Sequence, residues 1–176
     1  HGWPILVLGL VGIAGGFFYT ASPLALKYLG LGDLCVFILM GPLMVLGSFF
    51  VLTGHGSLEA LVVSLPIGSL VAAILSGNNL RDIAHDTAAS VRTTAGRLGR
   101  RWAQREYTAL VLSAYVFIVI LTASRILPFG SLATLLTLPL AVRNIRLALT
   151  SRVETSHLLA AIDIQTAQVH LLFGLL

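Results

Sequence analysis

The chain has 176 residues, of which 57% are apolar and only 10% are charged, and its formal net charge is +4. Soluble domains average about 45 to 50% apolar and about 25% charged residues, so this composition excludes an ordinary soluble globular domain. Cys35 is the only cysteine, which excludes an internal disulfide bond. We therefore expect an integral membrane protein embedded in the lipid bilayer.

Six apolar stretches of 17 to 20 residues follow one another along the chain. Each is long enough to cross about 30 Å of hydrocarbon as a helix. Because hydrocarbon offers the backbone no hydrogen-bond partners, these segments must be helices rather than open strands. The predicted fold is an all-α, polytopic transmembrane helix bundle, with kinks at Pro66 and Pro139, which lie inside spans. The predicted spans are residues 4–20, 34–52, 58–77, 107–123, 126–142 and 158–176.

Ten of the eleven Lys and Arg residues fall in the connections after the first, third and fifth spans. Basic residues are retained on the cytoplasmic side, so these connections are predicted to be cytoplasmic, with His55 and Arg125 on the other side. This distribution accounts for the net charge without any nucleic acid partner. The ten residues are Lys27, Arg81, Arg92, Arg97, Arg100, Arg101, Arg105, Arg143, Arg146 and Arg152.

The most polar run, "NNLRDIAHD" at residues 78–86, directly follows the third span. If the helix continues through it, Asn79, Asp82 and Asp86 fall at positions i, i+3 and i+7 and share one face. Such oxygen ligands suit Mg²⁺, which is usually shared between one or two carboxylates and substrate phosphates. Arginines in the same connection can hold phosphate oxygens. The run therefore suggests Mg²⁺ and a lipid diphosphate, and a solvated helix face with local ion pairs is the alternative.

Three segments resemble one known family. Residues 78–99, "NNLRDIAHDTAASVRTTAGRLG", are similar to the second aspartate-rich motif of the UbiA superfamily of intramembrane prenyltransferases. The pattern N-N-x-R-D-x-x-x-D, followed by T-x-x-x-x-L-G, is typical of its 1,4-dihydroxy-2-naphthoate polyprenyltransferase branch, which serves menaquinone synthesis. Residues 19–33, "YTASPLALKYLGLGD", and the ending "TAQVHLLFGLL" also resemble that branch. The three matches occur in the right order.

The resemblance implies a bundle of nine transmembrane helices around a cavity, in which two aspartate-rich motifs bind Mg²⁺ and the diphosphate of a polyprenyl donor. It implies that Asp82 and Asp86 are metal ligands, that Asn78 and Asn79 are supporting amides, and that Arg81 is a diphosphate or structural partner. The implied reaction is Mg²⁺-dependent transfer of the polyprenyl group to an aromatic acid, 1,4-dihydroxy-2-naphthoate, which gives demethylmenaquinone.

By the same resemblance, the six predicted spans correspond to the last six of nine. Residues 1–176 are then expected to form a single, N-terminally incomplete domain that lacks about three helices and the first aspartate motif. We expect this chain alone to be inactive, because only one of the two aspartate motifs that bind the diphosphate through Mg²⁺ is present. The expected location is the bacterial cell membrane, with the aspartate motif on the cytoplasmic side.

Arg92, Tyr19 and Lys27 are further candidates for contact with the diphosphate. Many family members have Gly-Lys where this chain has Ser90 and Val91, and Arg92 is the next cation along the chain. Tyr19 and Lys27 lie in the second resembling segment, and for both the alternative role is an ordinary anchor at the membrane interface.

The last span contains Asp163, Thr166 and His170 at positions i, i+3 and i+7. Ionisable groups at membrane depth usually face the bundle interior or a cavity. Two roles are open, contact with the aromatic acceptor and polar contacts between helices. The second is the commoner, so no catalytic role is predicted for these residues.

Two alternatives remain at this point. A prenyltransferase of the same superfamily with homogentisate, 4-hydroxybenzoate or chlorophyllide as acceptor would carry similar motifs. A transporter or channel subunit would use Asp82 and Asp86 to bind cations at the entrance of its pathway. A transporter would more naturally show acidic groups near the membrane midplane and paired interrupted helices.

Overall fold

The structure, a computed structural model, describes residues 2–88, 91, 93–152 and 156–176. Among these residues there are helices, turns and loops but no β-strand. Six helical segments are long and apolar enough to cross a membrane. The predicted all-α, polytopic bundle is therefore confirmed.

The helices in chain order include short π and 3₁₀ segments, labelled η, which continue or join the longer α-helices. Three of the six spans are composite, since α3, η1 and α4 run on as one span, as do η2 with α8 and η3 with α9. The elements are α1 (Gly2–Thr20), α2 (Leu26–Leu29), α3 (Gly32–Ile38), η1 (Leu39–Leu43), α4 (Met44–Thr53), α5 (Leu58–Ala88), α6 (Thr94–Leu98), α7 (Arg100–Ala123), η2 (Phe129–Thr137), α8 (Leu138–Thr150), η3 (Ser156–Leu159) and α9 (Ile162–Leu175).

Several predicted spans were shorter than the helical segments of the structure. The third span continues as one helix of 31 residues to Ala88, the fourth begins at Arg100, and the fifth covers Phe129–Thr150. The reason is that hydropathy marks only the part of a helix that suits hydrocarbon, whereas backbone hydrogen bonding carries the helix on into its polar ends. The polar run after the third span is therefore helical, as the shared-face prediction required.

The prolines behave differently from one another. A kink inside a helix was predicted at Pro139. In the structure η2 ends at Thr137 and Pro139 lies in the first turn of α8, so this proline stands at the start of a helix. A proline is tolerated there because its missing N–H would have no helical partner. Pro66 does lie within continuous α5, and Pro42 lies within η1, a π-helical turn. The wider π-helical turn accommodates Pro42, which has no backbone N–H and whose ring would clash with the preceding turn of an α-helix.

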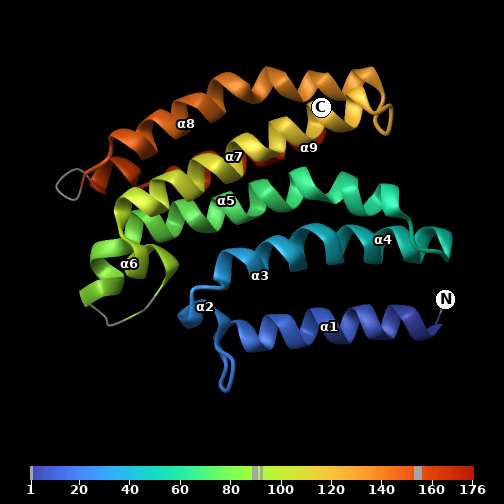
Figure 1. The fold of residues 1–176 in the computed structure, drawn as a ribbon, viewed down its shortest axis with the longest axis horizontal. Coiled ribbons are helices and arrows are strands. Elements are labelled where there is room, and N and C mark those ends of the chain that lie inside the picture. The colour runs from blue at the N-terminus through green and yellow to red at the C-terminus, as the bar shows by residue number, and fades with distance from the viewer. Residues whose placement is uncertain (1, 89–90, 92, 153–155) are drawn as a thin grey trace.

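The helices run side by side along the long axis of the molecule (Figure 1). The buried core lies between α5, α7, α8 and α9, where Leu70, Tyr107, Ala141 and Ile162 are fully enclosed. In contrast, α1 at the edge of the bundle has no buried residue. Many of its apolar side chains are exposed, as lipid contact allows.

Glycines bring α5 into close contact with the α3–α4 span. A Cβ atom at Gly41 would lie only 2.6 Å from the Cα atom of Gly68, and a Cβ atom at Gly68 would lie 2.9 Å from the carbonyl oxygen of Phe37. Small residues at a helix crossing let backbones approach, which is a main source of packing energy between helices in membranes. This contact fixes α3, and therefore Asp33 near its start, against α5.

The connections gather at two opposite ends of the bundle. Segments α2 and α6 lie at one end, whereas the α4–α5 and α7–η2 connections lie at the other (Figure 1). Lys27 on α2 and Arg97 on α6 are therefore at the end opposite His55 and Arg125. The predicted grouping of these residues is confirmed, and which end faces the cytoplasm stays a prediction.

Gly68→Ala should destabilise the bundle by about 1 to 3 kcal/mol, because the added methyl group meets backbone atoms that have no rotamer to escape into. Unfolding in mixed detergent micelles measures this change. Gly47→Ala is the matched control, since a Cβ there meets no atom within 4 Å. Equal stabilities for the two variants would contradict the close crossing.

The orientation is tested with cysteines introduced at Leu98 and Gly56, both exposed, in a Cys35→Ser background. A membrane-impermeant thiol reagent on intact cells should label position 56 and spare position 98, because the basic end is predicted to be cytoplasmic. Labelling of position 98 alone would reverse the orientation.

Candidate functional site

The polar end of α5 carries most of the predicted site residues. The helix continues unbroken to Ala88, so Asn79, Asp82 and Asp86 lie on one face over two turns. Asn79 is buried, whereas Asp82 and Asp86 are half-buried. The two carboxylates therefore lie near the surface of the bundle end, where they remain accessible.

Arg81 is the most connected side chain at this end. Its Nε donates to Asp82 Oδ1 at 2.8 Å and its Nη2 donates to Asp82 Oδ2 at 2.9 Å, so the pair is bidentate. Its Nη1 donates to Asp163 Oδ2 on α9 at 2.7 Å, and its Nη2 also donates to Asn78 Oδ1. One guanidinium thus holds two carboxylates and an amide oxygen from two helices.

The network gives Asp163 a definite role. Its second oxygen, Oδ1, accepts the backbone N–H of Ile164 at 2.9 Å in the first turn of α9. A carboxylate there is also favoured by the helix dipole. Asp163 therefore links α9 to the aspartate motif through Arg81, which supports the interpretation of polar contacts between helices.

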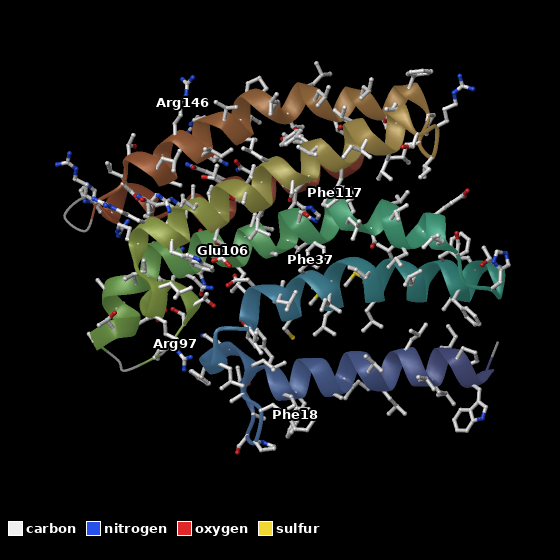
Figure 2. All side chains as sticks on the ribbon, in the orientation of Figure 1. Phe18, Phe37, Arg97, Glu106, Phe117 and Arg146 are labelled. Atoms are coloured by element: carbon white, nitrogen blue, oxygen red, sulfur yellow. The ribbon has the colours of Figure 1, made fainter. Side chains whose placement is uncertain are left out.

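A second polar group lies on the other side of α5. Asn79 Nδ2 donates to Asp33 Oδ1 at 3.3 Å, and Asp33, in the first turn of α3, is only 6% exposed. Glu106 on α7 is half-buried, and its carboxylate is close enough to interact electrostatically with that of Asp33. Figure 2 shows Glu106 toward the same end of the bundle as Arg97. Three helices therefore contribute to this group.

Tyr19 and Lys27 lie close to the start of α3. A Cβ atom at Gly32 would be 3.6 Å from the Tyr19 hydroxyl oxygen and 3.6 Å from the Lys27 Cα atom. The Tyr19 hydroxyl is also near enough to Asp33 for an electrostatic interaction. Both residues are thus near the polar end of α5, and their contact with a diphosphate stays a prediction.

Two arginines of the connection after the third span contact different neighbours. Arg97 donates to the carbonyl oxygens of Tyr28, at 2.9 Å, and Leu29, so it ties α6 to the end of α2. Arg100 donates to Ser151 Oγ at 2.9 Å, between α7 and α8. These contacts give both arginines a structural role. Arg92, predicted as a substitute for the family lysine, lies outside the described residues.

Thr166 and His170, the other two polar residues singled out on α9, are buried and half-buried respectively. Thr166 is buried, and its hydroxyl is 2.7 Å from the hydroxyl of Tyr107 on α7. His170 is half-buried, and its Nδ1 has no hydrogen-bond partner among the described residues. Contacts between helices therefore account for Thr166 as well as Asp163.

The donor set at the end of α5 fits a divalent ion that is shared with a substrate. Within the part of the chain that the structure describes, no group of three or more acidic, His or Cys side chains could hold a metal alone. The Asp86 carboxylate has no ion pair or hydrogen bond among those residues, and Asp82 is held in place by Arg81. Two carboxylates one turn apart suit Mg²⁺, which commonly takes its remaining ligands from water and phosphate.

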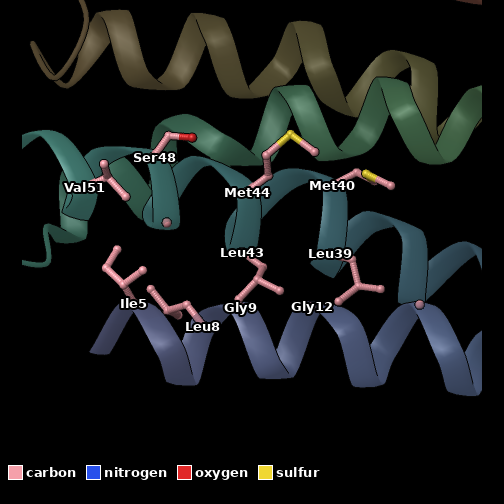
Figure 3. Close-up of a pocket in the computed structure, with 12 residues that line it drawn as sticks. Ile5, Leu8, Gly9, Gly12, Leu39, Met40, Leu43, Met44, Ser48 and Val51 are labelled. Atoms are coloured by element: carbon pink, nitrogen blue, oxygen red, sulfur yellow. The ribbon is translucent and has the colours of Figure 1, made fainter. Parts of the chain in front are cut away.

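An apolar cavity of about 480 Å³ separates α1 from η1 and α4 (Figure 3). It extends from Ile5 and Val51 at one end to Gly16 and Leu39 at the other, and the latter end is nearer the start of α3. Glycines widen it, since their missing side chains leave room between the helices. Its lining is Ile5, Leu8, Gly9, Gly12, Gly16, Leu39, Met40, Leu43, Met44, Gly47, Ser48 and Val51.

Comparison with known proteins identifies the family. Residues 1–161 match the UbiA prenyltransferase family. This chain belongs to the UbiA prenyltransferase family. It is 32% identical over 174 residues to a 1,4-dihydroxy-2-naphthoate octaprenyltransferase of Bacillus subtilis, an alignment that covers 99% of this chain and 55% of the relative. The recognition made from the sequence motifs is thereby confirmed.

Two further relatives show the breadth of the UbiA family around this chain. A 1,4-dihydroxy-2-naphthoate octaprenyltransferase of Mycobacterium leprae is 35% identical over 145 residues, which are 82% of this chain and 48% of the relative. A UbiA prenyltransferase domain-containing protein 1 of Dictyostelium discoideum is 40% identical over 114 residues, 65% of this chain and 34% of the relative. The chain spans about half or less of the length of these curated relatives.

The sequence analysis of this UbiA family member missed two acidic residues at the site. Asp33 was only the last letter of a resembling segment, and Glu106 lay one residue before the predicted fourth span. Because α7 begins at Arg100, Glu106 is in fact within a membrane-spanning helix. An acidic residue in such a helix is by itself a signal of function, and a wider span would have revealed it.

The Arg81–Asp163 pair should contribute a coupling free energy of about 1 kcal/mol, because both side chains are about three-quarters buried. A double-mutant cycle with Arg81→Gln and Asp163→Asn, followed by unfolding in mixed micelles, measures it. Arg146→Gln, an exposed arginine on α8, is the control and should combine additively with Asp163→Asn. Additive effects of the Arg81 and Asp163 variants would show that the pair carries no stability.

Proposed function

We propose that this protein transfers a polyprenyl group from polyprenyl diphosphate to 1,4-dihydroxy-2-naphthoate, with Mg²⁺ held by Asp82 and Asp86. The observation that carries the proposal is the pair of accessible carboxylates, one turn apart and next to Arg81, at the polar end of an otherwise apolar helix. The naphthoate acceptor is supported by two relatives that carry this name and align with 99% and 82% of the chain.

When bound, Mg²⁺ would neutralise charge on the diphosphate leaving group. Asp82 and Asp86 hold the ion, and Asn78 keeps Arg81 directed toward Asp82. Arg81 adds positive charge beside the diphosphate, where charge develops as the allylic C–O bond breaks. The chain's own role at this end is thus to bind and orient the diphosphate.

The rest of the bundle has to hold a long apolar donor and exclude water. The cavity along α1 is lined mainly by apolar side chains, and the end near Leu39 lies toward the start of α3. An isoprenoid tail in such a groove loses no polar contact and is kept out of water. A water-poor site also protects the allylic carbocation from hydrolysis.

The membrane setting follows from the same features. The six spans support a multi-pass protein, and the basic residues near α2, α6 and α7 support a cytoplasmic position for the aspartate motif. The naphthoate octaprenyltransferases among the relatives are bacterial, which supports the bacterial cell membrane as the location.

Asp82→Ala and Asp86→Ala should each lower turnover at least about 100-fold, because each removes a ligand of an ion that supplies several kcal/mol of transition-state stabilisation. The assay uses membranes that contain the full gene product, labelled polyprenyl diphosphate and 1,4-dihydroxy-2-naphthoate, with Mg²⁺ or a chelator. Glu59→Gln, at the opposite end of α5, should keep normal turnover. Near-normal turnover of either aspartate variant would refute the metal assignment.

A further inference from the structure

Two carboxylates near the aspartate motif have no role in the proposed diphosphate site. Asp33, in the first turn of α3, contacts Asn79 of α5. Glu106, on α7, lies near Asp33 and near the side chain of Ser76, which is one turn before Asn79 on α5. Asp33 is the enclosed member of the pair, at 6% exposure, whereas Glu106 is half-buried. A ligand that approaches this pair therefore meets Glu106 first.

The pair lacks a balancing charge within the described part of the chain. The ion pairs among those residues all involve Arg81, on the other side of α5. Asn79 Nδ2 donates a hydrogen bond to Asp33 Oδ1 at 3.3 Å, but Asp33 Oδ2 has no hydrogen-bond partner among those residues. Two carboxyl groups this close in a weakly polar environment disfavour each other's ionisation, and a hydrogen-bond donor stabilises the one that is ionised.

The chemistry of the pair selects the kind of partner. A diphosphate is disfavoured, because its negative charge would add to the repulsion. A metal ion held by the pair alone is disfavoured too, since the described residues include no group of three acidic, His or Cys side chains. A neutral O–H group suits it best, because a hydroxyl can donate to a carboxylate without bringing a charge.

The pair is also at the right place relative to the proposed reaction. Asn79, which contacts Asp33, lies three residues before Asp82 on the same face of α5. Side chains with this spacing are about 5 to 6 Å apart at their Cβ atoms. An aromatic ring whose hydroxyl reaches Glu106 therefore lies beside the diphosphate end of the donor, where its ring carbon has to meet the allylic carbon.

We propose that Glu106 accepts a hydrogen bond from a hydroxyl group of the aromatic acceptor, and that Asp33 is a positioning residue behind it. This inference rests on the proposed function for the identity of the acceptor. The carboxylate of the acceptor points away from the pair, because it would be repelled, so the contact fixes the orientation of the ring as well as its position.

The test measures acceptor binding without turnover. The full gene product in lipid nanodiscs is titrated anaerobically with 1,4-dihydroxy-2-naphthoate and with its 1,4-dimethoxy analogue, in the absence of Mg²⁺ and polyprenyl diphosphate. The unmodified protein should bind the dihydroxy compound at least about 10-fold more tightly, as expected for a hydrogen bond to a charged group. Glu106→Gln and Glu106→Met should bring the two affinities to within about threefold, with the larger loss for Met, which has no oxygen acceptor.

Two controls separate recognition from folding. Glu59→Gln should keep the full preference for the dihydroxy compound, and all Glu106 variants should bind polyprenyl diphosphate as the unmodified protein does. Asp33→Asn should weaken the preference, and the double variant Asp33→Asn/Glu106→Gln should be no weaker than Glu106→Gln alone, because Asp33 acts through Glu106.

The outcomes distinguish this inference from the proposed function. A Glu106→Met protein that keeps the preference for the dihydroxy compound would overturn the inference and leave the metal assignment untouched. If the unmodified protein binds 4-hydroxybenzoate or homogentisate instead, and Glu106→Met loses the preference for the free hydroxyl, the choice of naphthoate is wrong and the role of Glu106 stands. Failure of the unmodified protein to distinguish any hydroxyaromatic acid from its methyl ether would also overturn the inference.

Discussion

The ion pairs of Arg81 are the interaction on which the arrangement of the candidate site depends. Carboxylates at the end of an apolar helix are costly unless they are paired and hydrogen-bonded. Arg81 meets this requirement for Asp82 through two parallel contacts and for Asp163 through a third, so it fixes the aspartate motif and joins α5 to α9. A planar fork with five donors can do this, whereas a lysine ammonium cannot hold both carboxylates in the same way. Any cation that binds to Asp82 therefore enters a site whose geometry is already set.

At the polar end of helix α5, Arg81 and Asn79 point toward different neighbouring helices and contact different carboxyl groups. On the side of α9, the single positive charge of Arg81 is shared between the carboxylates of Asp82 and Asp163. On the side of α3 and α7, the neutral side chains of Asn79 and Ser76 lie against Asp33 and Glu106, and no described cation forms an ion pair with either carboxyl group. Adjacent residues, Asn78 and Asn79, belong to different sides because consecutive residues on a helix are separated by about 100°. The proposed diphosphate donor would bind near Arg81 and the proposed hydroxylated acceptor near Glu106, without a conformational change.

The sequence predicted what depends on local pattern. Span length and apolar content predicted six membrane helices, and the i, i+3, i+7 spacing predicted the face that carries Asp82 and Asp86. The pairing of Asp33 with Asn79 joins residues 46 apart, and that of Arg81 with Asp163 joins residues 82 apart. Such contacts follow from how helices pack, and hydropathy contains no information on which face of a helix meets which neighbour. For the same reason, the structural role of Arg97 could not be read from a count of basic residues.

Packing density differs sharply between the two sides of the α3–α4 span, and this difference suits a site that must be rigid at one end and accommodating along its length. Gly41 and Gly68 bring that span into backbone contact with α5, which holds Asp33 in register with Asn79. On the opposite side, the glycines of α1 leave an apolar cavity of about 480 Å³, and α1 has no buried residue. A flexible tail that fills this space displaces only loosely held lipid or side chains, so its binding costs little reorganisation. Because the tight crossing lies between the cavity and α5, the proposed binding of tails of different length in the cavity would not require the carboxylates of α5 to shift.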